Sequence, residues 1–163
     1  MANGHLGALI AYAIKANADP QLLRRLIADG SGCEVVTAVE LALALRAGCP
    51  AELVLMNGIG KRDEELHLAL AAGALINAES LDELARLLAL AADHDGARLG
   101  LRLNPALGAD THPHLATGAA SAKFGISLAD LGKALALMRD AGQPLASLGA
   151  HIGSNIDSLE PFA

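Results

Sequence analysis

Short apolar segments alternate with longer segments of helical period along this chain, and this alternation constrains the fold more than any other feature. The apolar runs cover residues 8–14, 34–36, 53–56, 74–76, 98–103 and 145–152. Between them, apolar residues recur at helical spacing, as Leu81, Leu84, Leu87 and Leu88 do. Strands that alternate with helices indicate a parallel sheet with crossover helices. The sequence therefore predicts an α/β fold of about six strands and five helices.

Local signals predict where the helices begin and end. The expected N-caps are Asp19, Thr37, Asp63 and Ser80. Glu40 and Glu83 stand three residues after Thr37 and Ser80, which is the spacing of a capping box. Gly30 and Gly73 are expected to end two of the helices. A last helix is predicted over 128–140, after a loop over 104–127 that is long enough to suggest a functional role.

Composition excludes several classes of function. The chain has 163 residues, of which 53% are hydrophobic, so it is long and apolar enough for a real core. Its net charge of −6 argues against a nucleic-acid partner, which needs a basic patch. No apolar run approaches the ~18 residues of a membrane span. The two cysteines, Cys33 and Cys49, are too few for a disulfide framework, so we expect a reducing, cytoplasmic location.

Two closures of the sheet remain open: a doubly wound open sheet or a (β/α)8 barrel. In both, function collects beyond the carboxyl ends of the strands. A barrel would need further βα units beyond those predicted here. The polar residues expected at these strand ends include Lys15, Glu34, Asn57, Arg102 and His151.

Lys15 follows the apolar run Ile10-Ala-Tyr-Ala-Ile14, so it is expected to leave a buried strand at the mouth of the fold. A desolvated lysine has a lowered pKa, and its free amine can form a Schiff base. A solvated lysine at the end of a strand is the alternative.

Two further groups of residues point to an anion. His151-Ile-Gly-Ser154 follows a strand, and Gly153 leaves room for a phosphate to approach the backbone, where Ser154 would donate its hydroxyl. The alternative is a turn with a buried histidine. Arg102 ends a strand and either fixes an anion or pairs with Glu34 on a neighbouring strand.

Three other motifs are set aside. Thr111-His-Pro-His114 lacks companion ligands for a metal. Gly58-Ile-Gly-Lys61 lacks the full Walker pattern, and Lys61 is interpreted as part of a solvated helix start. The cysteines are interpreted as packed small hydrophobes.

Several motifs, in order, resemble one known family. They are Tyr12-Ala-Ile-Lys-Ala-Asn17, Gly30-Ser-Gly32, Glu40-Leu41, Asn57-Gly-Ile-Gly-Lys61, Asn77-Ala-Glu-Ser80, Arg102-Leu-Asn-Pro105, Thr111-His-Pro113, Thr117-Gly118, Lys123-Phe-Gly125 and His151-Ile-Gly-Ser154. Over residues 10–162 they resemble the fold-type III decarboxylases that depend on pyridoxal 5′-phosphate. Within that family, the Asn-Pro, Thr-His-Pro, Thr-Gly and Lys-Phe-Gly series favours the diaminopimelate decarboxylases over the ornithine and arginine enzymes.

The resemblance implies a role for each candidate residue. Lys15 would hold pyridoxal phosphate as a Schiff base, and it would also shuttle protons. His151 would stack on the pyridine ring, Ser154 would contact the phosphate, and Arg102 would line the cofactor site. Glu34 stands where the family usually has an aspartate, which is one methylene shorter, so we expect a conservative change with a different pairing geometry. The implied reaction converts meso-diaminopimelate to lysine, in a cytoplasmic homodimer.

The resemblance also implies that the chain is one incomplete domain, residues 1–163, of a partial (β/α)8 barrel without the C-terminal β domain. The glycine-rich phosphate loop and the acidic partner of the pyridine nitrogen would belong to later segments. We therefore expect the chain alone to associate or dissolve poorly, and to have little decarboxylase activity.

Other readings of the residues remain. One alternative substrate is another basic amino acid, namely ornithine, lysine, arginine or carboxynorspermidine. A non-catalytic relative that binds the cofactor is a second reading, although it need not keep Lys15, His151 and Ser154 together. A structural module would leave these strand-end residues unexplained. An alanine-racemase-like isomerase would have different residues around its lysine.

Overall fold

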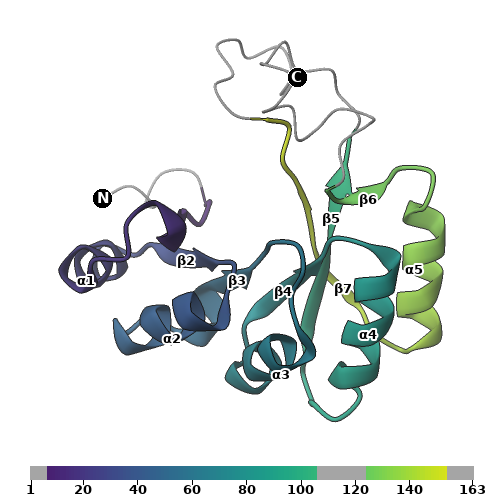
Figure 1. The fold of residues 1–163 in the computed structure, drawn as a ribbon, viewed down its shortest axis with the longest axis horizontal. Coiled ribbons are helices and arrows are strands. Elements are labelled where there is room, and N and C mark those ends of the chain that lie inside the picture. Colours follow the sequence, from purple (N-terminus) through teal and green to yellow (C-terminus); the bar gives the residue numbers. More distant parts are fainter. Residues whose placement is uncertain (1–6, 106–123, 154–163) are drawn as a thin grey trace. The chain divides into compact units, whose positions relative to one another are not determined.

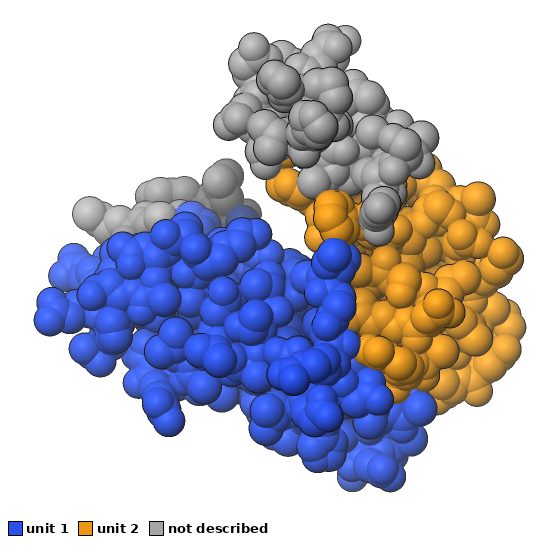
Figure 2. Space-filling model, viewed as in Figure 1, with its two compact units in different colours: residues 1–76, 89–98 blue, residues 77–88, 99–163 orange. Residues whose placement is uncertain are grey.

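Strands and helices alternate in the computed structural model, which describes residues 7–105 and 124–153 (Figure 1). These residues contain seven β-strands, five α-helices and two 3₁₀ helices. The chain divides into two compact units, coloured separately in Figure 2. Unit 1 comprises residues 1–76 and 89–98, and unit 2 comprises residues 77–88 and 99–163.

Unit 1 is built on parallel strands. They are β1 (Ala11–Ala13), β2 (Gly32–Val35), β3 (Val54–Met56) and the first half of β4 (Leu75–Ala78). Ala13 pairs with Glu34, Glu34 with Leu55, and Met56 with Ile76. The 3₁₀ helices η1 (Ile14–Ala16) and η2 (Ala51–Leu53) flank β1 and β3. The strand predicted over 8–14 is therefore shorter than expected: residues 8–10 lie outside β1, and η1 takes Ile14.

Helices α1 (Pro20–Ala28), α2 (Ala38–Arg46) and α3 (Asp63–Ala72) follow the first three strands. Each helix buries leucine on the side that faces the strands, and Leu23, Leu41 and Leu66 are at most 3% exposed. Burying such a side chain stabilises the fold by about 1.5–3 kcal/mol. The core of unit 1 therefore lies between these helices and strands whose residues Val35, Val54 and Met56 are fully buried.

The predicted helix caps are confirmed at three of the four helices. Asp19 accepts hydrogen bonds from the backbone N–H groups of Gln21 and Leu22, both at 2.9 Å. Thr37 and Ser80 accept from the N–H groups three residues on, at 3.2 and 3.1 Å. Each of these side-chain acceptors satisfies a backbone N–H that the helix itself leaves without a partner.

Two details of the caps differ from the prediction. The carboxylates of Glu40 and Glu83 accept from the residues before the caps, from the N–H of Val36 at 2.7 Å and of Glu79 at 2.9 Å. Asp63 is not an N-cap, because it is already the first helical residue and Arg62 holds the cap position. The acidic residues 63–65 lie in the first turn of α3, where their negative charges interact favourably with the helix dipole. This interaction does not depend on which residue begins the helix.

The carboxylate of Glu65 serves two helices. Its Oε1 accepts from the N–H of Ala38 at the start of α2 (3.1 Å), and its Oε2 accepts from the N–H of Arg62 (3.2 Å). The Ala38 amide, ahead of the Arg62 contacts, holds the pKa of Glu65 below its ordinary value. Glu65 therefore ties α2 to α3 within unit 1.

Unit 2 contains the second half of β4, most of α4 (Leu81–Ala91) and β5 (Arg98–Asn104), and all of β6 (Ile126–Ser127), α5 (Leu131–Asp140) and β7 (Leu145–Ala150). Strand β5 pairs in parallel with β6, through Leu103 and Ile126, and with β7, through Arg102 and Gly149. The short strand β6 lies in the predicted loop, so the described residues contain seven strands where six were predicted. Gly125 permits it, because a Cβ there would lie 2.8 Å from the backbone of Leu103 and Asn104.

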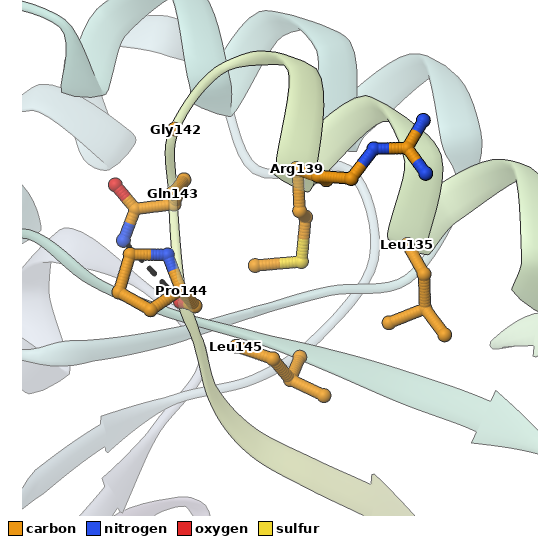
Figure 3. A pocket seen from close by; sticks show the side chains of 7 residues that line it. Leu135, Arg139, Gly142, Gln143, Pro144 and Leu145 are labelled. Atoms are coloured by element: carbon orange, nitrogen blue, oxygen red, sulfur yellow. Dashed lines mark hydrogen bonds between the residues drawn. The ribbon is translucent and has the colours of Figure 1, made fainter.

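A groove of about 420 Å³ lies between the end of α5 and the start of β7 (Figure 3). Met138, Pro144 and Leu145 line it with apolar surface, and Arg139 stands at its edge, paired with Asp140 at 2.9 Å. Because parallel strands carry their functional residues at the carboxyl end, this groove at the amino end of β7 is not part of the candidate site. Of the described helices, none is both long and apolar enough to cross a bilayer.

Candidate active site at the strand ends

Lys15 lies just beyond β1, within η1. The structure contradicts the prediction that this lysine is desolvated, because Lys15 is exposed whereas its neighbour Ile14 is 1% exposed. Among the described residues, Lys15 has no hydrogen-bond or ion-pair partner. Its amine is therefore accessible to a reactant at the carboxyl end of β1.

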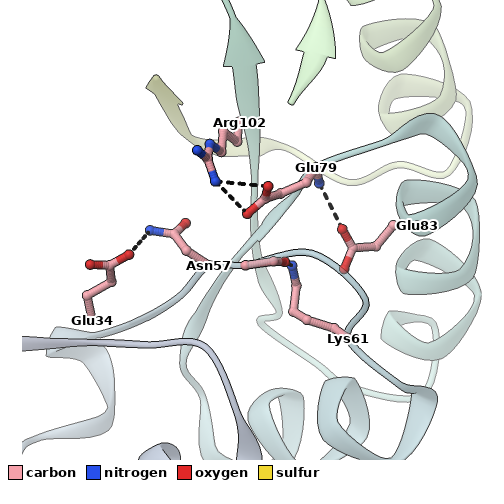
Figure 4. A network of polar contacts seen from close by, with 7 residues as sticks. Glu34, Asn57, Lys61, Glu79, Glu83 and Arg102 are labelled. Atoms are coloured by element: carbon pink, nitrogen blue, oxygen red, sulfur yellow. Dashed lines mark hydrogen bonds and ion pairs between the residues drawn. The ribbon is translucent and has the colours of Figure 1, made fainter. Parts of the chain in front are cut away.

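Glu34 lies in β2 beside β1, and the register places it opposite Ala13, two residues before Lys15. Asn57, directly after β3, donates from Nδ2 to Glu34 Oε1 at 3.1 Å (Figure 4). The backbone N–H of Asn57 donates to the carbonyl of Val35 at 2.9 Å, which holds Asn57 against β2. Unit 1 thus brings Lys15, Glu34 and Asn57 to one edge, with the Glu34 carboxylate oriented by an amide.

The sequence suggested that Lys61 is part of a solvated helix start, and the structure contradicts this. It is 2% exposed, and its Nζ donates to the carbonyl of Gly58. Gly58 and Gly60 both have positive φ, at 97° and 73°, which a glycine adopts without strain. These two glycines turn the chain back so that the ammonium of Lys61 meets a carbonyl, while Arg62 next to it stays 73% exposed.

Arg102 lies in β5 and pairs with Glu79, not with Glu34 as one alternative predicted. Its Nη1 donates to Glu79 Oε1 at 3.0 Å and to Oε2 at 2.9 Å (Figure 4). The side chains of Glu79 and Arg102 are 2% and 18% exposed. Arg102 Cζ also lies 6.0 Å from the centre of the Phe124 ring, within range of a cation–π contact. The guanidinium is therefore held in place by a carboxylate, and its remaining donors can meet a further acceptor.

His151 follows β7 at the same end as Arg102, because Arg102 pairs with Gly149 and Leu103 with Ala150. It is exposed, so the alternative of a buried histidine in a turn is wrong. Gly153 has φ 139°, in the region that favours glycine. Ser154 lies outside the described residues, as do residues 111–114. Unit 2 therefore brings Glu79, Arg102 and His151 to one edge.

Sequence reasoning did not identify a polar layer below this edge. Ser147 donates from Oγ to Asn77 Oδ1, and both side chains fill the space above Gly100, where a Cβ would collide with them. Asn77 Nδ2 faces Gly149, at 3.5 Å from the position of a Cβ. Two-residue spacing along a strand gives the signal, because positions 100 and 102 share a face of β5 and positions 147 and 149 share a face of β7, while Glu79 and His151 directly follow β4 and β7.

One family model matches almost the whole chain. Residues 3–163 match the pyridoxal-binding domain of the pyridoxal-dependent decarboxylases. The chain belongs to this family.

Curated relatives and solved structures support the same assignment. The chain is 41% identical to the diaminopimelate decarboxylase of Deinococcus radiodurans over 95% of its length, and 37% identical to that of Neisseria meningitidis serogroup A over 96%. It covers 39% of each of those proteins, so it spans about two fifths of the length of the curated relatives it matches.

Solved structures of the family have the same fold. Diaminopimelate decarboxylase from Helicobacter pylori, complexed with L-lysine, has a TM-score of 0.89 at 33% identity, and the match covers 94% of this chain and 40% of that one. A lysine/ornithine decarboxylase from Vibrio vulnificus, complexed with putrescine, has a TM-score of 0.78 at 25% identity, over 96% and 39% of the two chains. The predicted fold class is therefore confirmed, as the α/β fold of the barrel of fold-type III decarboxylases.

The residues present fit pyridoxal phosphate, the cofactor of this family. A primary amine that can condense with its aldehyde is accessible at Lys15. Unit 2, taken by itself, holds a guanidinium fixed by a carboxylate and an exposed imidazole, which suit an anionic aromatic ring. The described part of the chain offers no group of three metal-ligating side chains.

Proposed function

We propose that this chain is part of an enzyme that decarboxylates meso-2,6-diaminopimelate to L-lysine with pyridoxal phosphate. The observation that carries the proposal is the accessible Lys15 at a strand end, in a chain whose relatives at 36–41% identity are diaminopimelate decarboxylases. We assign residues 1–163 to one partial (β/α)8 domain, in a cytoplasmic homodimer.

Lys15 is proposed to bind the cofactor covalently through Nζ. An amine that is released when substrate binds also lies at the reacting centre, so Nζ can return a proton to the carbon that has lost CO2. When bound, the cofactor supplies an electron-accepting ring that stabilises the charge left by that loss.

The charged side chains are proposed to orient the cofactor. Glu34, fixed by Asn57, presents a carboxylate beside β1. Arg102, fixed by Glu79, would line the site, and His151, which follows β7, would stack on the ring. Ser154 is proposed to donate to the phosphate. Preorganised groups of this kind lower the barrier because they need little rearrangement during the reaction.

The first experiment tests the attachment of the cofactor. The purified protein is mixed with pyridoxal phosphate, and its absorbance is recorded before and after borohydride for wild type, Lys15→Ala and Lys133→Ala. Lys133 is a matched control, since it is an exposed lysine paired with Asp130 at 2.8 Å. A visible band that borohydride traps on Lys15, lost in Lys15→Ala and kept in Lys133→Ala, supports the assignment. Equal trapping in all three proteins refutes it.

The second experiment tests the substrate. CO2 release by the complete protein is measured with meso-diaminopimelate, ornithine, lysine and arginine. We expect the first to be preferred and Lys15→Ala to abolish its turnover. The similarity to a lysine/ornithine decarboxylase gives the main alternative, so a preference for ornithine or lysine would replace diaminopimelate in the proposal. No turnover of any of them, with the cofactor bound, would favour a non-catalytic relative.

The 163-residue chain alone is proposed to have little or no decarboxylase activity and to associate in solution. It spans about two fifths of the length of its relatives. Light scattering and the CO2 assay test this, and a monomer with normal turnover would contradict it.

A further inference from the structure

Two histidines that are 27 positions apart in the sequence meet on the surface of unit 1. His67 is an exposed residue of α3, and His94 follows α4 in the turn 92–97. Nδ1 of His67 and Nε2 of His94 lie 3.3 Å apart. The ring centroids are 4.9 Å apart, with the ring planes at 67°. The backbone of His94 is held by its own bonds, from its N–H to Ala91 and from Ala97 to its carbonyl.

We propose that His67 and His94 form a two-histidine clamp for Zn²⁺ or a similar transition-metal ion. Zinc binds imidazole nitrogen at about 2.0–2.1 Å and prefers tetrahedral geometry. Two nitrogens 3.3 Å apart subtend an angle of about 107° at such an ion, which is close to the tetrahedral angle. Two imidazoles bound in this way would have ring centroids roughly 5 Å apart, as this pair has.

The protons of the two rings are compatible with metal binding. The present hydrogen bond needs an N–H on one of the two facing nitrogens, whereas a metal needs a lone pair on both. A change of tautomer in one ring satisfies this, because each neutral imidazole can keep its proton on the outer nitrogen, Nε2 of His67 and Nδ1 of His94. The charge of the protein does not change. Protonation of either imidazole would compete with the metal, because a zinc-bound histidine must be neutral.

The surroundings favour a cation but leave the site open. Glu64 stands one turn before His67 on α3, and Asp93 and Asp95 flank His94; all three acids are exposed. Among the described residues no third ligating side chain completes a group of three. Water is therefore expected to fill the remaining positions. The clamp would fasten the turn 92–97 to α3, so that bound zinc stabilises unit 1 through linkage.

The test is a zinc titration of the 163-residue chain by calorimetry and thermal unfolding, at about pH 7.5 and again at about pH 5.5, where free imidazole is mostly protonated. The variants are His67→Ala and His94→Ala, with His67→Gln and His94→Gln for any that fail to fold. The matched control is His112→Ala/His114→Ala, which removes the sequence's other histidine pair. Competition between Zn²⁺ and Cu²⁺ tests the class of metal, because imidazole sites bind Cu²⁺ more tightly.

We expect one zinc per chain, a higher Tm with zinc, and loss of both effects at the lower pH. Removing either histidine should weaken binding by roughly 10²-fold, because the second imidazole binds intramolecularly. The control should bind as wild type does. Equal affinity in wild type and all variants, or no binding up to about 1 mM zinc, would overturn the proposal. A loss confined to the control would move the site to residues 112–114. The outcome does not depend on the proposed decarboxylase function.

Discussion

Replacing Gly100 with alanine tests the polar layer below Arg102. A Cβ at position 100 would collide with Ser147 Oγ and Asn77 Oδ1, and would lie 2.8 Å from the carbonyl oxygen of Ser147. The two side-chain oxygens can rotate away, which breaks their hydrogen bond. The carbonyl cannot, because it belongs to β7, so the strands must separate.

The expected cost follows from these contacts. Overpacking of a filled interior costs about 1–3 kcal/mol. Loss of the bond between Ser147 and Asn77 adds about 1 kcal/mol. Alanine has less conformational freedom than glycine in the unfolded chain, which stabilises the folded state by about 0.4–1 kcal/mol and offsets part of this cost. We therefore expect Gly100→Ala to lower the free energy of unfolding by about 1–3.5 kcal/mol.

Urea unfolding followed by far-ultraviolet circular dichroism measures this effect, since the chain has no tryptophan. Gly132→Ala is the matched control, because Gly132 lies in α5 with nothing within 4 Å of its Cβ position, so we expect no loss of stability. Gly100→Ala/Ser147→Ala should recover part of the loss but not all, since the carbonyl contact remains. If Gly100→Ala is within about 0.5 kcal/mol of wild type, the layer does not restrict this position.

Three further predictions concern unit 1 and the ion pair of unit 2. Glu79→Ala should lower the free energy of unfolding, measured with urea, by about 2–4 kcal/mol, because it leaves the partly buried Arg102 without its carboxylate. Glu79→Gln should lower it less, and equal losses in the two variants would show that charge is not the cause. The pKa of Glu65 is lowered in the folded state, so its carboxylate stabilises the fold above pH 4.5, and this stabilisation is lost as the pH falls through the folded pKa. Glu65→Gln should therefore make the free energy of unfolding less dependent on acid pH and lower it by about 1–2 kcal/mol near pH 7. An unchanged acid dependence would contradict this. Burial raises the pKa of Cys33 and raises that of Cys49 to about 12, so a disulfide reagent should react with both thiols at pH 7 only after denaturant is added, and fast labelling of the native chain would show that these thiols are accessible.

The sequence was most informative where the deciding interaction is local. Asp19, Thr37 and Ser80 cap helices through donors two or three residues away, so their side chains alone predict the bonds. The α/β alternation likewise predicted the helices, and similarity to solved decarboxylases confirmed the fold class. Strand boundaries were predicted less well, because η1 takes Ile14 from the first predicted strand and β6 depends on the close approach of Gly125 to the backbone of Leu103 and Asn104.

Partners that are far apart in the sequence could not be predicted. Arg102 was expected to pair with Glu34 as one alternative, yet it pairs with Glu79, 23 residues away. Lys61 carries a charge in a run of charged residues, but two glycine turns bury it. Lys15 was expected to be desolvated because an apolar strand precedes it, and η1 instead leaves it exposed. In each case the path of the backbone between the residues decides the contact, and the residue types alone do not predict that path.

The bond from Ala38 to Glu65 bears on how such a domain can be recombined. Because one carboxylate caps the start of two successive helices, the segment from α2 through β3 to the first turn of α3 carries its own matching donor and acceptor. A crossover between two relatives inside residues 38–65 would combine an amide from one parent with a side chain from the other. Crossovers placed outside those residues keep the pair together, so we expect chimaeras cut there to retain more of the parental stability.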